Sequence, residues 1–337
     1  MNLRDEIQKY FKVYSEEKIG DTLRFYVIPV ANEIDVRRFL QSLSQEYEVT
    51  MRYHYGELVL ELHRAKDKEN YTLNIILLIA TFATTTIIGS TFYGDKLDIV
   101  GGIMFSLAIM FVLGSHEMGH YFAARRWKMR TSLPYFIPFP TIIGTLGAVI
   151  KHRGPIPNRK ALFDVGVAGP IAGIVASVIV LLIGLQIPFE IETEPTLYIG
   201  TPPIFDAILV LVNYQRDVIH PVAFAGWVGF FITFLNMIPV GQLDGGHVLR
   251  AMVGETSERV SRIMPLVLIA YGIYIMRVFN QPNTIWIFWG VITFFFSMQK
   301  HPQPVDDETP IGLKRYVVGV FAFILALMCF VPVPFYY

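Results

Sequence analysis

The stretch Gly114-Ser115-His116-Glu117-Met118-Gly119-His120 stands near the end of a long apolar segment that runs from Ile99 to Ala124. Residues four apart lie on one face of an α-helix, so His116 and His120 can hold one metal ion between their imidazoles. Glu117 is offset by one position, where its carboxylate can hold a water on that metal without being a ligand. The motif predicts a zinc hydrolase, and its surroundings are typical of a membrane span.

The composition indicates a polytopic α-helical membrane protein. Of the 337 residues, 53% are hydrophobic and 17% are charged, whereas a soluble domain has about 25% charged residues. Lys and Arg together equal Asp and Glu, so the net charge favours neither nucleic acid nor an acidic partner. Cys329 is the only cysteine in the sequence. An internal disulfide and a multi-cysteine zinc site are therefore excluded, which leaves His and carboxylate side chains as metal ligands.

The hydropathy pattern divides the chain into two predicted domains. Residues 1–68 are polar and predict a small soluble α+β domain, with a strand at 22–28, a helix over 36–43 and a hairpin within 49–62. This domain could be a cytoplasmic cap or a module for dimerisation or substrate docking, and both interpretations stay open. Residues 71–337 are the predicted membrane-embedded domain, with a core at 99–250 and additional C-terminal spans over 263–333.

About six to eight membrane spans are expected. Seven apolar segments are identified, and 204–212 is predicted as an interfacial helix; the segments are 71–92, 99–124, 163–187, 221–238, 263–275, 284–298 and 317–333. Three later loops on the side of the N-terminal domain carry fourteen Lys and Arg residues, against three in the loops on the other side. This asymmetry predicts a cytoplasmic N-terminal domain. The charged N-terminus resembles no transit peptide, which favours the cell membrane over a plastid.

A third metal ligand is expected, because a catalytic zinc site has three protein ligands and one open position. The segment 221–238 runs toward the cytoplasm and leads to Asp244, which reaches the same level as the two histidines. A carboxylate at that depth is costly to bury without a partner, and a cation would relieve the cost. Asp244 is the predicted third ligand, His247 is the alternative, and Gly245 and Gly246 let the backbone turn or approach closely.

The combined motifs resemble the site-2 protease family of intramembrane zinc metalloproteases, and the closest resemblance is to the branch without a PDZ domain found in archaea, cyanobacteria and plastids. The resemblance covers about residues 100–250. It rests on His116-Glu117-x-x-His120, Asn236-x-x-Pro239, Leu243-Asp244-Gly245, Phe139-Pro140, Gly144-Thr145-Leu146-Gly147, Ala168-Gly169-Pro170, His220-Pro221-Val222 and Gly241-Gln242-Leu243.

The resemblance implies one zinc ion (Zn2+) per chain, held by His116, His120 and Asp244. It implies that Glu117 is the general base that activates water, and that Asn236 hydrogen-bonds the substrate carbonyl or its oxyanion. The implied reaction is hydrolysis of a peptide bond in or near a transmembrane helix of a membrane-anchored substrate, as in regulated intramembrane proteolysis. The implied partners are transmembrane protein substrates and the lipid bilayer.

The third span departs from the family pattern. Many relatives carry an Asn soon after its Gly-Pro pair, whereas this chain has Gly169-Pro170-Ile171-Ala172-Gly173, which puts a polar contribution from the span in doubt. Gly166, Gly169 and Gly173 are spaced for close helix packing. Asp164 is predicted to cap the N-terminus of the helix.

A protease for transmembrane helices must unwind its substrate locally, because the helix engages its carbonyls in its own hydrogen bonds. The stretch 133–150 contains three prolines, which disfavour a regular helix, yet it is apolar enough to enter the membrane. We expect a re-entrant hairpin there. Its edge, with Gly144, Gly147 and Val149, is predicted to bind the unwound substrate as an added strand.

Two functions from other classes fit part of the pattern. A catalytically inactive relative would bind membrane segments, but Glu117, the residue that such a protein can lose most freely, is present. A metal transporter would show an internal repeat with polar residues along a path, and no such repeat is found. No pattern in the sequence indicates the oligomeric state, the physiological substrate or the scissile bond.

Overall fold

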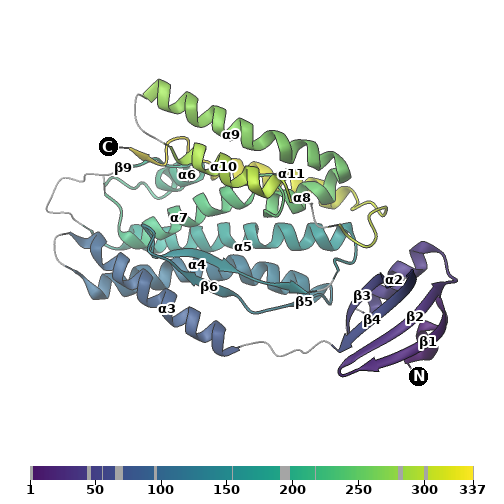
Figure 1. Cartoon of the computed structure of the whole chain (residues 1–337). Helices are drawn as coiled ribbons and strands as arrows, with labels where there is room; N and C mark the ends of the chain where they lie inside the picture. The colour runs from purple at the N-terminus through teal and green to yellow at the C-terminus, as the bar shows by residue number, and fades with distance from the viewer. Residues whose placement is uncertain are drawn as a thin grey trace.

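The structure, a computed structural model, describes residues 3–43, 47–54, 56–64, 71–94, 97–153, 155–189, 198–216, 218–279, 284–299 and 303–336. These residues form an N-terminal α+β unit and a larger helical unit (Figure 1). The predicted boundary between the two domains, at residues 68–71, falls on residues 65–70, which lie outside the described residues.

The N-terminal unit is a four-stranded antiparallel sheet with the strand order β1-β2-β4-β3. Alternate strand residues such as Phe25 and Leu60 are buried together with Phe39 of α2, so one face of the sheet and the apolar face of α2 form the core. The edge strand β1 was not predicted, because most of its side chains are exposed and it shows no alternating pattern. The elements are α1 (Leu3–Ile7), β1 (Phe11–Ile19), β2 (Thr22–Pro29), α2 (Glu33–Leu43), β3 (Tyr47–His54) and β4 (Glu57–Arg64).

The helical unit contains helices and short two-stranded pairs. Its helices are α3 (Tyr71–Ser90), η1 (Thr91–Tyr93), α4 (Ile99–Arg126), α5 (Arg159–Gln186), α6 (Pro203–Leu211), α7 (Pro221–Asn236), α8 (Asp244–Val253), η2 (Gly254–Thr256), α9 (Ser257–Phe279), α10 (Ile285–Ser297) and α11 (Leu313–Met328). Its strands are β5 (Arg130–Thr131), paired with β8 (His152–Arg153), β6 (Tyr135–Pro138), paired with β7 (Thr145–Val149), and β9 (Tyr198–Ile199), paired with β10 (Phe335–Tyr336).

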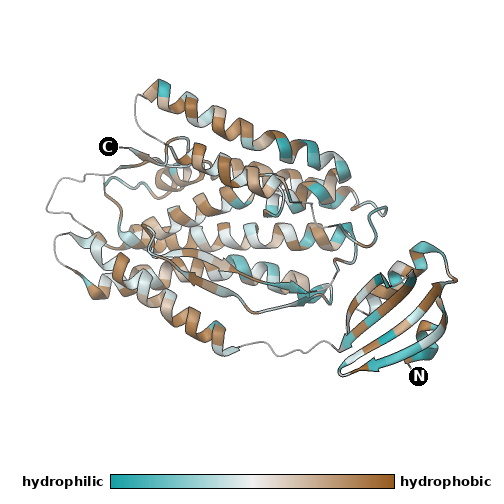
Figure 2. Cartoon of the chain, in the orientation of Figure 1, coloured by the Kyte–Doolittle hydropathy of each residue, from teal (hydrophilic) through white to brown (hydrophobic). Residues whose placement is uncertain are grey.

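Within the described residues, four helical stretches are long and apolar enough to cross a membrane, and they cover Tyr71–Tyr93, Ile99–Arg126, Arg159–Gln186 and Asp244–Phe279. Apolar residues dominate the outer helices of this unit (Figure 2). The last stretch is longer than the predicted segment at 263–275. Its second part, α9, carries Arg259 near its start and Arg277 near its end, and these charges shorten the apolar window in the sequence although the helix continues through them.

Helices α4, α5 and α7 lie at the centre of the helical unit and supply most of its buried apolar residues (Figure 1). Small residues allow these helices to approach closely. A Cβ on Gly119 of α4 would lie 2.6 Å from the carbonyl oxygen of Ala168 in α5, and one on Gly184 of α5 would lie 2.2 Å from the backbone nitrogen of Ala223 in α7. The centre of the molecule is therefore packed backbone against backbone, which gives side chains on these helices fixed positions.

Candidate metal centre

Helix α4 carries the His-Glu motif toward its C-terminal end. Asp98 begins the helix as an N-cap that accepts a hydrogen bond of 3.0 Å from the Gly101 backbone nitrogen. His116 lies about 26 Å along the axis from Ile99. His116, Glu117 and His120 are all buried, with exposed fractions of 5%, 9% and 6%.

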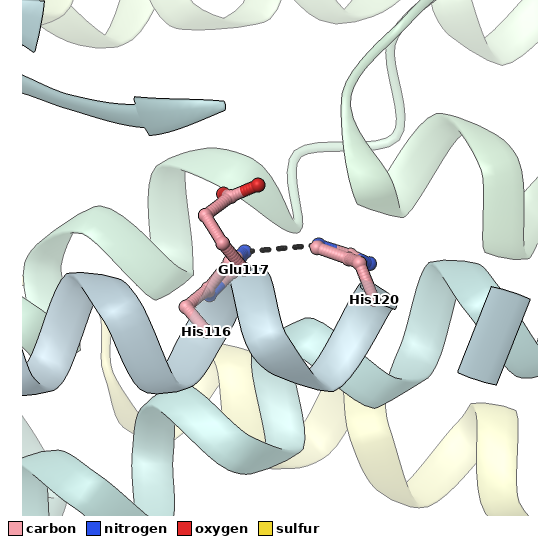
Figure 3. Close-up of side chains that lie close together, drawn as sticks. All are labelled: His116, Glu117 and His120. Atoms are coloured by element: carbon pink, nitrogen blue, oxygen red, sulfur yellow. Dashed lines mark hydrogen bonds between the residues drawn. The ribbon is translucent and has the colours of Figure 1, made fainter. Parts of the chain in front are cut away.

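Three predicted ligands converge on one point. The distance from His116 Nε2 to Asp244 Oδ2 is 3.1 Å, that from His120 Nε2 to Asp244 Oδ1 is 3.2 Å, and the two Nε2 atoms are 3.2 Å apart. The two imidazoles point toward one another (Figure 3). Zinc ligands at bond lengths of roughly 2.0–2.1 Å in a tetrahedron are roughly 3.3 Å apart. The donor set therefore fits one tetrahedral metal ion with a fourth position open.

Asp244 reaches the histidines because α8 begins directly after a tight turn at the end of α7. A Cβ on Gly245 would lie 2.0 Å from the Met237 carbonyl oxygen, and one on Gly246 would lie 2.6 Å from that of Gly241, so only glycines fit at both positions. As the first residue of α8, Asp244 places its charge at the positive end of the helix dipole. The alternative ligand, His247, lies one turn further on, with its Cβ against Gly166 of α5.

Helix α5 orients one of the imidazoles. The Val165 carbonyl oxygen lies 2.8 Å from His120 Nδ1. A proton on Nδ1 donates to this carbonyl and leaves Nε2, the atom nearer to Asp244, as the free ligand atom.

Two further polar groups lie beside the donor set. The Asn236 side-chain nitrogen, at the last residue of α7, is 3.3 Å from His116 Nε2. In Figure 3 the Glu117 carboxylate lies off the line between the histidines, and one of its oxygens is within 4.8 Å of an imidazole nitrogen of each histidine. A carboxylate this close to a metal site can exchange protons with water held there.

The hairpin expected within 133–150 is the β6–β7 pair. In the part of the chain that the structure describes, β7 pairs with β6 alone, so no strand pairs with its other edge, called the free edge here; the Gly147 N–H donates to Thr145 Oγ1 at 3.0 Å. Gly147 and Val149 lie in β7, and Val149 is 44% exposed. Gly144 lies in the turn with a φ of 78°, and a Cβ on it would lie 2.7 Å from the Thr84 carbonyl oxygen. Gly144 therefore faces α3.

Two side chains of α3 bind the hairpin, one at each end, and neither was predicted from the sequence. Asn74 Nδ2 donates to the carbonyl oxygens of Pro134 (2.9 Å) and Leu133 (3.2 Å), and Thr84 Oγ1 donates to that of Gly144 (2.7 Å). The available signal was that Asn74 is the only amide within the apolar segment 71–92.

Asp164 is not the N-cap of its helix, contrary to the prediction. The cap is Asn158, whose side chain accepts a hydrogen bond of 2.9 Å from the Ala161 backbone nitrogen, so α5 begins one turn earlier than expected. Asp164 instead accepts hydrogen bonds from the Arg315 guanidinium at 2.7 and 2.8 Å and from Trp127 Nε1 at 3.0 Å. It ties α11 and the end of α4 to α5.

Comparison with known proteins agrees with this geometry. Residues 104–278, about half of the chain, match the model of peptidase family M50. The chain belongs to peptidase family M50. The family resemblance expected from the motifs is thereby confirmed.

Relatives of this M50 chain include plant proteins. It is 30% identical over 240 residues to the probable zinc metalloprotease EGY1, chloroplastic, of Arabidopsis thaliana (67% of this chain and 42% of the relative). It is 30% identical over 261 residues to the probable zinc metalloprotease EGY2, chloroplastic, of Oryza sativa subsp. indica (73% and 45%). The chain thus covers less than half the length of these relatives. The structure of the site-2 protease from Methanocaldococcus jannaschii aligns with a TM-score of 0.33 at 17% identity, over 69% of this chain and 91% of that one.

Proposed function

We propose that this M50 chain is a zinc-dependent endopeptidase of the membrane that hydrolyses peptide bonds in or near transmembrane helices of membrane-anchored substrates. One observation carries the proposal. Asp244, on a separate helix, places its two carboxylate oxygens 3.1 and 3.2 Å from the Nε2 atoms of His116 and His120. Two buried histidines and an Asp244 carboxylate that is 14% exposed, next to a further carboxylate, form the set that a hydrolytic metal site requires.

In this proposal each polar group has one task. His116, His120 and Asp244 hold one zinc ion per chain, which when bound lowers the pKa of a coordinated water and polarises a carbonyl. Glu117 takes a proton from the attacking water and gives it to the leaving amine. Asn236 donates from its amide to the substrate carbonyl oxygen, where negative charge develops.

The substrate binds, in the same proposal, as an extended strand along the free edge of β7. Main-chain groups around Gly147 and Val149 bind the unwound backbone, and Gly144 supports this edge by closing the turn against α3. Contacts between β7 and α4, the helix that carries Glu117, support the proposal, because they bring this strand close to the helix of the assigned base.

We further propose seven membrane spans, formed by α3, α4, α5, α7, the α8–α9 stretch, α10 and α11, in a cell membrane with the N-terminal α+β domain in the cytoplasm. The distribution of Lys and Arg supports this orientation. Helices α7, with 16 residues, and α10, with 13, extend about 24 and 20 Å, so each spans a hydrocarbon core of about 30 Å only together with flanking residues.

Zinc content of the purified chain is the first test. We expect about one zinc per chain in the wild type and loss of zinc in His116→Ala and Asp244→Ala. Zinc kept by Asp244→Ala would show that the third ligand is wrong and would make His247 the next candidate. A wild type that binds no zinc would overturn the proposal.

Cleavage is the second test, with a single-span model substrate whose helix contains a Gly-Pro pair, reconstituted in lipid vesicles. Glu117→Gln should keep its zinc and lose cleavage by roughly 10²–10⁴-fold. Wild-type cleavage by this variant would refute the assigned base. A zinc-loaded wild type that binds the span without cutting it would favour the inactive relative.

A further inference from the structure

Both histidines of the metal centre lie against glycines of α5. A Cβ on Gly169 would lie 2.1 Å from His120 Nε2, 2.4 Å from Cε1 and 2.5 Å from Cδ2. A Cβ on Gly173, one turn further along α5, would lie 2.9 Å from His116 Nδ1. The rings therefore occupy the space that side chains at these two positions would fill.

The same face of α5 supplies the hydrogen-bond acceptor for His120. Val165, Gly169 and Gly173 follow one another at four-residue intervals, so they share one face of the helix. The Val165 carbonyl oxygen lies 2.8 Å from His120 Nδ1. One end of the ring is thus bound by this carbonyl, and its side lies on the bare backbone at Gly169.

Gly290 of α10 packs against an aliphatic side chain instead of a predicted ligand. A Cβ on Gly290 of α10 would lie 2.5 Å from Ile269 Cγ1, an aliphatic atom of α9 with no polar role. The three atoms nearest to a Cβ built on Gly169 all belong to the ring of His120, a predicted ligand. A methyl group at position 169 must push the imidazole, because its nearest contact is far below van der Waals distance.

We propose that Gly169 and Gly173 are positioning residues of the metal centre. They hold His120 and His116 in the orientation in which both Nε2 atoms meet the Asp244 carboxylate, and they do so by leaving out a side chain. The proposal rests on the metal site of the proposed function. Helix α5 provides no ligand side chain, yet in this proposal it controls the geometry of the ligands from α4.

The test compares Gly169→Ala and Gly173→Ala with Gly290→Ala in the full chain. Zinc affinity is measured by competition with a chelator, the visible absorption of the Co2+-substituted protein reports ligand geometry, and thermal unfolding reports stability. We expect Gly169→Ala to weaken zinc binding by roughly 10–100-fold and to change the Co2+ spectrum. Gly173→Ala should do so less, because its contact is longer. Gly290→Ala should lower stability while it keeps zinc affinity and spectrum.

The outcomes separate this inference from the function on which it rests. A wild type and a Gly169→Ala variant that bind zinc equally tightly, with the same Co2+ spectrum, overturn the positioning role and leave the proposed function standing. A wild type without zinc overturns both. If Gly169→Ala does not fold, Gly173→Ala decides: wild-type affinity and spectrum in that variant overturn the inference.

Discussion

The contact between α4 and α5 and the contact between α3 and the β6–β7 hairpin are built in different ways. The first brings the two backbones together at Gly119, sets the two imidazoles against Gly169 and Gly173, and buries the three residues of the His-Glu motif. The second depends on hydrogen bonds from Asn74 and Thr84 to the hairpin. Val149 in strand β7 of this hairpin is 44% exposed.

The difference matches the two tasks in the proposed function. Ligands and acid–base groups need fixed distances, which close-packed helices provide. A strand that accepts an unwound substrate must be exposed along one edge, and such an element cannot be packed on both sides. Substitutions in the first contact should therefore affect the chemical step, and those in the second should affect substrate binding.

The largest effect among these predictions is expected at Asn236. Replacing Asn236 by Ala should lower kcat by roughly 10²–10³-fold, because the donor to the developing oxyanion is lost. KM and zinc content should stay close to wild type. The measurement is steady-state cleavage of the reconstituted single-span substrate, together with metal analysis. Loss of zinc in this variant would mean that Asn236 supports the ligands and not the substrate.

The hairpin edge should show the next largest effect. Val149→Pro removes a backbone N–H and should lower kcat/KM by up to roughly tenfold, the upper end of the range for one hydrogen bond, with zinc content unchanged. Val149→Thr keeps both the N–H and the branched side chain and serves as the control. Val149 is a cleaner position than Gly147, whose φ of 103° proline cannot adopt. Equal cleavage by wild type and Val149→Pro would rule out strand addition at this position.

Weakening the bond between α3 and the hairpin should have a smaller effect. Asn74→Ala and Thr84→Val each remove hydrogen bonds worth about 0.5–1.5 kcal/mol, so kcat/KM should fall by several-fold while zinc affinity is kept. Hydrogen exchange over residues 135–149 should become faster. Thr91→Val is the matched control, because Thr91 Oγ1 donates within its own segment, to the Ile88 carbonyl. Unchanged exchange in both variants would show that other contacts hold the hairpin.

The smallest effect on catalysis is expected in the N-terminal unit. Glu61 is buried, which by itself would raise its pKa, but its hydrogen bonds and ion pairs with Arg52 and Arg24 outweigh burial and lower the pKa from its usual 4.5. A lowered pKa in the folded state stabilises the unit above about pH 4.5, and this contribution is lost as the pH falls through the folded-state pKa.

Glu61→Gln should therefore lower stability at neutral pH by about 1 kcal/mol and should flatten its dependence on pH below 4.5. Hydrogen exchange in β4 of the full chain, followed as a function of pH, measures both the stability at neutral pH and its dependence on pH. Glu16→Gln is the control, because Glu16 is exposed and lies 3.5 Å from Arg4. A change in zinc content or cleavage in Glu61→Gln would show that the stability of this unit affects the metal centre, contrary to the prediction.

The sequence by itself determined the membrane character, the family and the candidate ligands. Spacing of four residues on a helix is a local property, so His116 and His120 could be paired without a structure. Asp244 could be paired with them because the order of spans brings alternate span ends to the same side of the membrane. The hairpin within 133–150 was also predictable, since proline excludes a helix whatever the neighbouring elements are.

Only the tertiary structure decided which side chains and glycines support these residues. Helix spacing suggested that Gly169 packs closely, but not that its partner is the ring of His120. The roles of Asn74 and Thr84 depend on contacts across some 60 residues of chain, and no local pattern encodes such contacts.

Asp164 also has a partner that could not be predicted from local sequence. Its position near a helix start suggested a cap, yet its partner is Arg315, some 150 residues away, and such pairing follows from how whole helices pack.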